Sequence, residues 1–189
     1  MEEDKDYINL IHGDLTRATQ IQNGMPDSIG VMSIKTANWT ILEASLLPTP
    51  RALWDSFGYE GELSCVFADS NVGKSILAVQ IADRIARTDN VLYLDLELSE
   101  KQFQLRYTGE HGKLYTFPDR LYRVSLDSNS LLEDNFEEAI IGGMEQMALQ
   151  TGCKIFIVDN LTYLCCAMEK GDAAGRLMIQ LNNLKKRYG

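Results

Sequence analysis

The stretch CVFADSNVGKSILAVQIADRIA, residues 65–86, joins a short apolar run to an amphipathic pattern through a loop of small and polar residues. Its middle, ADSNVGKS (residues 68–75), matches the phosphate-loop pattern G-x-x-x-x-G-K-S/T, except that Ala68 stands where the first glycine is expected. The alternative is a chance string on an ordinary strand–helix turn. An apolar run precedes the match and a helical pattern follows it, which is the context that the motif requires. The stretch therefore predicts a nucleotide-binding loop.

Each part of this loop has a chemical role in holding phosphate. Backbone N–H groups at a helix N-terminus attract anionic oxygens, and Gly73 allows the backbone to approach them closely. Lys74 supplies the cation for the β- and γ-phosphates, and Ser75 supplies the hydroxyl for Mg²⁺. Ala68 is tolerated if its φ stays negative. The predicted nucleotide-binding residues of the loop and its flanks are Ala68, Asp69, Ser70, Asn71, Val72, Gly73, Lys74, Ser75 and Ile76.

From Leu63 onward, short apolar runs alternate with amphipathic stretches. The predicted strands are residues 63–67, 91–96, 121–126 and 154–159. Three of them are nearly continuously apolar, as is typical of strands buried on both faces of a parallel sheet. The helical pattern of residues 73–87 and the capping-box patterns at Ser99–Gln102 and Ser130–Glu133 place helices between the strands, and Gly152 marks a helix end. The alternation predicts an α/β fold with a mainly parallel sheet and flanking helices.

Two acidic positions follow strands and complete the predicted chemistry. In IFIVDN, Asp159 comes after four apolar residues, which suits a carboxylate that holds Mg²⁺ through water. In VLYLDLELSEKQFQLRY, a strand ends on Asp95 and Glu97, and a carboxylate there can polarise the water that attacks the γ-phosphate. The alternative is that Glu97 is a solvated residue leading into the next helix. The expected catalytic residues are Glu97 and Lys74, and the expected metal ligands are Ser75 and Asp159.

ADSNVGKS, LDLELSEKQFQLR (residues 94–106) and IFIVDN together resemble motifs of the RecA-like P-loop ATPases. The resemblance is to the branch of DnaB-type and plasmid RepA-type hexameric helicases and their AAA-type relatives, and it covers about Pro50 to the C-terminus. It implies ATP and Mg²⁺ as cofactors, ATP hydrolysis in DNA replication, and a homo-oligomer that is a hexamer in the full-length form. It also implies that Arg106 lies against the adenine, with an ordinary position on a solvated helix face as the alternative.

The resemblance also sets expectations about domain organisation. From the breaks in the sequence pattern, residues 1–57 are expected to form a lead-in segment that packs on, or extends from, the core. The resemblance makes residues 58–189 the N-terminal portion of a RecA-like nucleotide-binding core. RecA-like domains continue after the strand of Asp159 with a polar sensor strand, DNA-contacting loops and an arginine or lysine finger. None of these is recognisable up to Gly189. We therefore expect a C-terminally truncated core that binds nucleotide but turns it over negligibly by itself.

The composition limits the partners that this chain can have. It has 18 basic and 27 acidic residues and a net charge of −9, so strong non-specific nucleic-acid binding by the chain alone is not expected. Single-stranded DNA is a candidate partner through regions beyond residue 189. No secretory signal or membrane-spanning run is visible, so we expect a cytoplasmic protein without membrane contact. The four cysteines show no zinc spacing and indicate reduced, buried thiols, with a redox switch at Cys165–Cys166 as the alternative.

Two other functions stay open at this point. The acidic balance favours a regulatory ATP-binding module that controls the assembly of a protein partner without DNA. A phosphoryl-transfer enzyme of the P-loop kinase type would need an arginine-rich lid over the phosphates, and no such cluster follows Asp159. Glu97 would also lack a clear purpose in such a kinase, so the sequence favours an ATPase.

Overall fold

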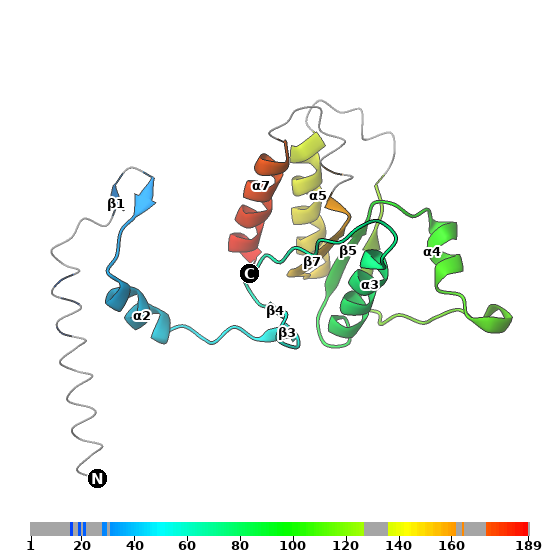
Figure 1. The fold of residues 1–189 in the computed structure, drawn as a ribbon, viewed down its shortest axis with the longest axis horizontal. Coiled ribbons are helices and arrows are strands. Elements are labelled where there is room, and N and C mark those ends of the chain that lie inside the picture. Colours follow the sequence, from blue (N-terminus) through cyan, green and yellow to red (C-terminus); the bar gives the residue numbers. More distant parts are fainter. Residues whose placement is uncertain are drawn as a thin grey trace, which may run out of the picture. The chain divides into compact units, whose positions relative to one another are not determined.

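The computed structural model describes residues 31–126, 136–161 and 173–188, together with Thr16, Thr19, Ile21, Ser28, Ile29 and Leu164. The chain divides into two compact units, Met1–Thr49 and Pro50–Gly189. Every predicted site residue belongs to the second unit, which Figure 1 shows as a small sheet with helices around it. The expectation that residues 1–57 form a lead-in segment packed on the core stays a prediction.

The first unit contains a short hairpin and one described helix of several turns. Strands β1 (Ser28–Ile29) and β2 (Met32–Ser33) pair antiparallel, and helix α2 spans Ala37–Ser45. Thr36 is the N-cap of α2, and its hydroxyl accepts a hydrogen bond from the Trp39 amide at 3.2 Å. This bond satisfies one of the backbone donors that the first turn of a helix leaves unpaired.

Three parallel strands form the described sheet of the second unit. Strand β5 (Val91–Asp95) lies in the middle, paired with β6 (Leu121–Val124) on one side and β7 (Ile155–Asp159) on the other. The register places Asp95 beside Asp159 at the carboxyl edge of the sheet. The strands predicted at residues 91–96, 121–126 and 154–159 are therefore confirmed, each slightly shorter than expected.

Helices precede, separate and follow these strands along the chain, as the alternating sequence pattern predicts. The described helices are α3 (Lys74–Ile85), α4 (Glu100–Arg106), the 3-10 helix η1 (Glu110–Gly112), α5 (Phe136–Thr151) and α7 (Ala173–Tyr188). The capping box of α4 is confirmed, because the Ser99 hydroxyl accepts from the Gln102 amide and the Gln102 side chain accepts from the Ser99 amide. Gly152, with φ of +66°, follows the end of α5 as predicted.

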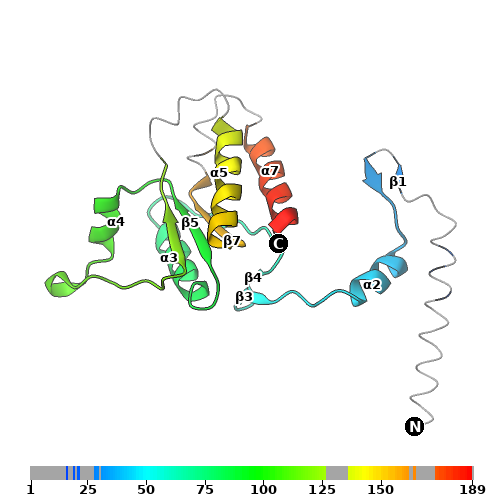
Figure 2. The same ribbon diagram turned by 180° about the vertical axis from the view of Figure 1, so that it is seen from behind.

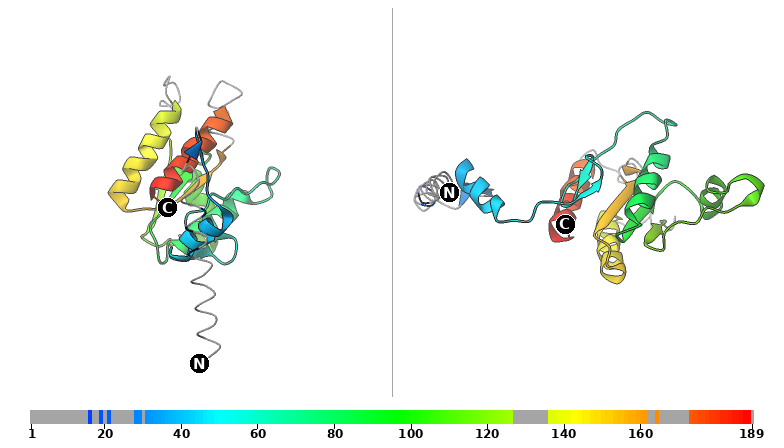
Figure 3. Two further views of the ribbon diagram at one scale, coloured as in Figure 1. Left: turned by 90° about the vertical axis from the view of Figure 1, so that its left-hand side faces the viewer. Right: turned by 90° about the horizontal axis from the view of Figure 1, so that it is seen from below.

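Both faces of β5 are covered, which explains why this strand is a continuous apolar run. Leu92 and Leu94 pack in a core with side chains of α5 and α7, whereas Val91 and Tyr93 pack in a second core with α3. The two sets are separated because successive side chains of a strand point to opposite faces. Figures 2 and 3 show α5 and α7 side by side on one face of the sheet, with α3 on the other.

A hairpin that the sequence did not predict packs beside α3. Its strands are β3 (Ala52–Trp54) and β4 (Gly58–Tyr59), which pair antiparallel. The Arg51 guanidinium donates to the Glu60 carboxylate at 2.9 Å and to the Asp89 carboxylate at 2.7 Å. The hydrogen bond from Arg51 lowers the pKa of Asp89. Arg51 thereby joins the hairpin to the turn between α3 and β5.

The strand predicted at residues 63–67 is wrong. The segment pairs with none of the strands that the structure describes, and Phe67 is 86% exposed. Its apolar residues predicted a buried strand, but a strand forms only where a neighbour takes its backbone N–H and C=O groups. None of the seven described strands is such a neighbour for this segment. The phosphate-loop sequence is therefore reached through an irregular run that faces solvent.

Some expectations fall outside the described part of the chain. The capping box predicted at Ser130–Glu133 and the pair Cys165–Cys166 lie there. Cys153 is buried as predicted, and this burial raises the pKa of its thiol. Cys65 is exposed, against the prediction, because it belongs to the unpaired run before the loop. Among the described residues, no helix is both long enough and apolar enough to cross a membrane.

Helix α7 offers a matched test of the core. Leu177 is 1% exposed in the core shared with α5 and β5, whereas Ile179 on the same helix is 63% exposed. We expect Leu177→Ala to lower the free energy of unfolding by about 2–5 kcal/mol, because it leaves a cavity among buried side chains. Ile179→Ala should change it by less than about 0.5 kcal/mol. Urea unfolding followed by circular dichroism measures both, and equal effects would contradict the packing of α7.

Candidate functional site

In the loop ADSNVGKS, the lysine side chain reaches back to the first two residues. The Lys74 ammonium group donates hydrogen bonds to the carbonyl oxygens of Ala68 and Asp69, each at 2.6 Å. Lys74 is the first residue of α3 and Gly73 is its N-cap, so the cation stands at the helix end whose dipole attracts anions. The loop is thereby closed around the N-terminus of α3.

Two residues of this loop have a left-handed backbone conformation, with positive φ. Asn71 has φ of +63° and Gly73 has φ of +95°, while Val72 between them has a negative φ. Left-handed residues in such a loop are typical of backbone turns whose N–H groups point toward one concave side and bind anions. Gly73 adopts a φ that favours glycine, although a Cβ there would meet no protein atom within 4 Å. Ala68 keeps a negative φ, which meets the condition under which alanine is tolerated at the first position.

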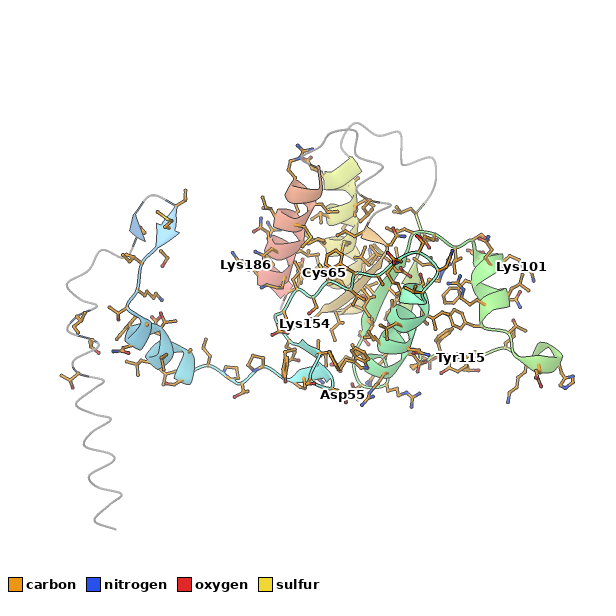
Figure 4. All side chains as sticks on the ribbon, in the orientation of Figure 1. Asp55, Cys65, Lys101, Tyr115, Lys154 and Lys186 are labelled. Atoms are coloured by element: carbon orange, nitrogen blue, oxygen red, sulfur yellow. The ribbon has the colours of Figure 1, made fainter. Side chains whose placement is uncertain are left out.

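Helix α3 sets the loop beside the carboxyl edge of the sheet. A short turn, residues 86–90, joins the end of α3 to the start of β5, so helix and strand run in opposite directions (Figure 1). The N-terminus of α3 therefore lies toward the edge at which β5 and β7 end, where α/β sheets form ligand sites. Figure 4 shows the side chains here and labels Lys154, which precedes β7 at the opposite edge. Within the loop, the exposed side chains are Ala68, Asp69, Ser70, Asn71, Val72 and Ile76, and the half-buried residues are Gly73, Lys74 and Ser75.

Asp159 ends β7 as a buried carboxylate. Tyr93, which is buried on the neighbouring strand β5, donates its hydroxyl hydrogen to Asp159 Oδ2 at 2.7 Å. Burial first, and then this hydrogen bond, raise the pKa of Tyr93, so its hydroxyl is a donor over the whole physiological range. One oxygen of Asp159 is thus committed to Tyr93, which holds the carboxylate in one orientation.

Glu97 stands in the turn after β5, next to the end of β7. The side-chain amide of Asn160 donates to Glu97 Oε1, and the Leu96 amide donates to the Asp159 carbonyl at 2.8 Å. The Asp95 carboxylate accepts a hydrogen bond from the Glu97 amide at 3.2 Å. The structure thus brings the two predicted carboxylates, Glu97 and Asp159, to the ends of neighbouring strands at one edge of the sheet.

Arg106 is the last residue of α4, and its side chain is exposed. The residues around it form an aromatic cluster, in which the Phe103 and Tyr107 ring centroids are 4.7 Å apart and those of Tyr107 and Phe117 are 5.1 Å apart. The predicted position of Arg106 against an adenine stays a prediction.

The oxygen donors at this edge suit Mg²⁺. Ser75 supplies a hydroxyl and Asp159 a carboxylate, and Mg²⁺ is usually held by one or two carboxylates together with substrate phosphates and water. Within the described ranges, no group of three or more His, Cys, Asp or Glu side chains forms a metal site. The donor set therefore fits a metal ion that is held partly by the phosphates of a nucleotide.

The loop, the strand ends and the sheet order agree with one known family. A family model described as an AAA domain matches residues 32–189. The chain belongs to the AAA domain family. A comparison with curated proteins gives no match. The AAA domain is an ATPase-type module of the P-loop NTPase kind, so the α/β fold predicted from the sequence is confirmed and nucleotide binding follows from the family.

Three residues at this edge of the AAA domain were given no role from the sequence. Tyr93 stood in an apolar run, Arg123 stood in another strand pattern, and Asn160 simply followed Asp159. They meet the predicted carboxylates through strand register, which chain order does not reveal. A polar side chain inside an otherwise apolar strand is the signal that could have indicated Tyr93 and Arg123.

Tyr93 can be tested by its contribution to stability. We expect Tyr93→Phe to lower the free energy of unfolding by about 2 kcal/mol, because a buried hydrogen bond to a carboxylate is lost. Tyr122→Phe on β6 is the matched control, since Tyr122 is exposed, and should change stability by less than about 0.5 kcal/mol. Urea unfolding measures both variants. A Tyr93→Phe protein as stable as the control would contradict the bond to Asp159.

Proposed function

We propose that this AAA domain binds ATP with Mg²⁺ at the loop 68–75 and hydrolyses it, as the motor module of an oligomeric, DNA-dependent ATPase of the helicase or replication type. One observation carries the proposal. Lys74 begins α3, whose N-terminus lies toward the sheet edge at which Asp159 ends β7 and Glu97 follows β5. A phosphate-binding cation, a metal-binding carboxylate and a water-orienting carboxylate are the parts that ATP hydrolysis needs.

Binding begins at the loop. Lys74 exchanges the carbonyl oxygens of Ala68 and Asp69 for phosphate oxygens, and bonds between two charged groups are stronger than bonds to neutral carbonyls. The backbone N–H groups of the loop and of the first turn of α3 receive the remaining phosphate oxygens. Arg106 is proposed to lie against the adenine. The nucleotide is thereby held at its phosphate end by charge and backbone together.

Hydrolysis requires a group that orients the attacking water. Glu97 is exposed, and Asn160 donates to one of its carboxylate oxygens, which fixes the group while the other oxygen can accept a hydrogen bond from water. Ser75 and, through water, Asp159 would hold Mg²⁺, which supplies positive charge to the transferred phosphoryl group. Lys74 contributes further positive charge there, and Glu97 takes up the proton of the water as it attacks.

Two substitutions separate binding from hydrolysis. We expect Lys74→Ala to weaken ATP binding at least about tenfold, because the charged donor to the phosphates is removed. Glu97→Gln should leave the ATP affinity within about twofold but lower kcat about a hundredfold or more, because the amide cannot take up a proton. Titration with a fluorescent ATP analogue and phosphate release by the full-length protein measure the two effects.

The same chain offers a control residue of the same type for each substitution. Lys154→Ala removes a lysine at the opposite edge of the sheet, and Glu100→Gln neutralises an exposed carboxylate in the first turn of α4. Both should keep ATP affinity and turnover within about twofold. If Lys154→Ala weakened binding as much as Lys74→Ala, the loop would not be the nucleotide site, and unchanged turnover in Glu97→Gln would remove Glu97 from the mechanism.

A regulatory ATP-binding module without DNA is the second candidate, and the net charge of −9 favours it. The two functions differ in their response to single-stranded DNA. A DNA motor should bind a single-stranded oligonucleotide with an affinity that falls steeply as salt rises, because counterions are released from the phosphate backbone. Fluorescence anisotropy of the full-length protein at several salt concentrations tests this. ATP binding without any DNA binding would favour the regulatory module.

A further inference from the structure

A charged pair in the sheet has no role in the function described so far. Asp95 ends β5 with 2% of its side chain exposed, and Arg123 of β6 has 19% of its side chain exposed. The desolvation of two charges offsets much of their attraction, so a buried ion pair contributes little net stability compared with apolar side chains. Such a pair can instead specify one local geometry, and its contacts here indicate which geometry that is.

Asp95 divides its two oxygens between the backbone and Arg123. Its Oδ1 accepts hydrogen bonds from the amides of Glu97 at 3.2 Å and Leu98 at 3.0 Å. Its Oδ2 accepts from Nε of Arg123 at 3.0 Å, and a second guanidinium nitrogen, Nη2, is also 3.0 Å from it. The Asp95 carboxylate therefore holds the turn that contains Glu97 through two backbone amides. The Arg123 guanidinium in turn holds the Asp95 carboxylate in place.

Arg123 also contacts that turn directly. Its Nη2 donates to the carbonyl oxygen of Leu98 at 2.5 Å, and its Cζ lies 4.6 Å from the centre of the Phe103 ring on α4. The guanidinium of Arg123 thus contacts three groups at once. They are the Asp95 carboxylate, the Leu98 carbonyl oxygen and the Phe103 ring of α4. A lysine ammonium has no planar fork and cannot make these contacts together.

We propose that Arg123 is a positioning residue for Glu97, acting through Asp95 and the Leu98 carbonyl. The proposal rests on the proposed ATP hydrolysis only for its kinetic consequence. The Glu97 side chain is exposed, so its direction depends on the backbone from which it starts and on its bond to Asn160. Arg123 on β6 fixes that backbone, and Asn160 after β7 holds the carboxylate. The water-orienting group is therefore held from both neighbours of β5.

The first test measures the restraint itself and needs no turnover. Amide hydrogen exchange at Glu97 and Leu98 is compared between the wild type and Arg123→Lys, with the Leu94 amide in β5 as the internal reference. We expect exchange of the two turn amides to become about tenfold faster or more while Leu94 is unchanged, because breaking a bond to a charged group opens the turn locally. Unchanged exchange at the turn overturns the proposal.

The second test measures the kinetic consequence in the full-length protein. Arg123→Lys should lower kcat about tenfold or more and leave the ATP affinity within about twofold, since a misplaced catalytic group can reduce the rate about a hundredfold per ångström. In a Glu97→Gln background the same substitution should add no further loss, because Arg123 acts through Glu97. An equal loss in both backgrounds, or faster exchange with unchanged kcat, overturns the positioning role.

Two controls keep the outcomes separate. Arg120→Lys changes an exposed arginine just before β6, which donates to the Thr88 carbonyl, and should leave exchange and turnover unaltered. Asp95→Asn keeps the shape of the side chain and should act in the same direction as Arg123→Lys; it replaces that variant if circular dichroism shows Arg123→Lys to be unfolded. A folded wild type that binds but does not hydrolyse ATP overturns the proposed function, and the exchange measurement still decides whether Arg123 holds the turn.

Discussion

Parallel pairing of β5 with β7 determines where the acidic groups of the site stand, because it aligns Asp95 with Asp159 at one edge. The Leu96 amide extends this pairing by one hydrogen bond to the Asp159 carbonyl. Since both faces of β5 are buried, a shift by one residue would turn Tyr93 into the core of α5 and α7. The apolar packing of β5 therefore fixes its register, and the register places the polar groups.

The two buried carboxylates at this edge are compensated in different ways. Asp95 is paired with the guanidinium of Arg123, so its charge is balanced and its oxygens are engaged within the fold. Asp159 is bonded to the neutral hydroxyl of Tyr93, which orients the group and brings no positive charge to it. A buried charge of this kind is favourable when a cation is close, so the edge suits a divalent ion that binds with an anionic ligand.

Much of the second unit could be predicted from the sequence because its signals are local. The apolar runs of three strands, the capping box at Ser99 and the glycine after α5 each depend on neighbouring residues only. The segment 63–67 carried the same apolar signal but lacks a described neighbouring strand, and pairing depends on residues far along the chain. The contacts of Tyr93, Arg123 and Asn160 likewise depend on the register of three strands. The sequence motifs therefore predicted where the candidate site lies but could not predict the hydrogen bonds that support it.

Lys74 is held by backbone carbonyl oxygens, and this affects how an anion can bind to this acidic chain. The ammonium group is bonded to the carbonyl oxygens of Ala68 and Asp69, which are neutral dipoles. These bonds keep the side chain in place without cancelling its formal charge. An approaching anion therefore encounters a full positive charge and does not have to displace a competing carboxylate from these two bonds. In a chain with a net charge of −9, a lysine held in this way at the N-terminus of α3 offers a negatively charged small molecule a positive group among many acidic ones.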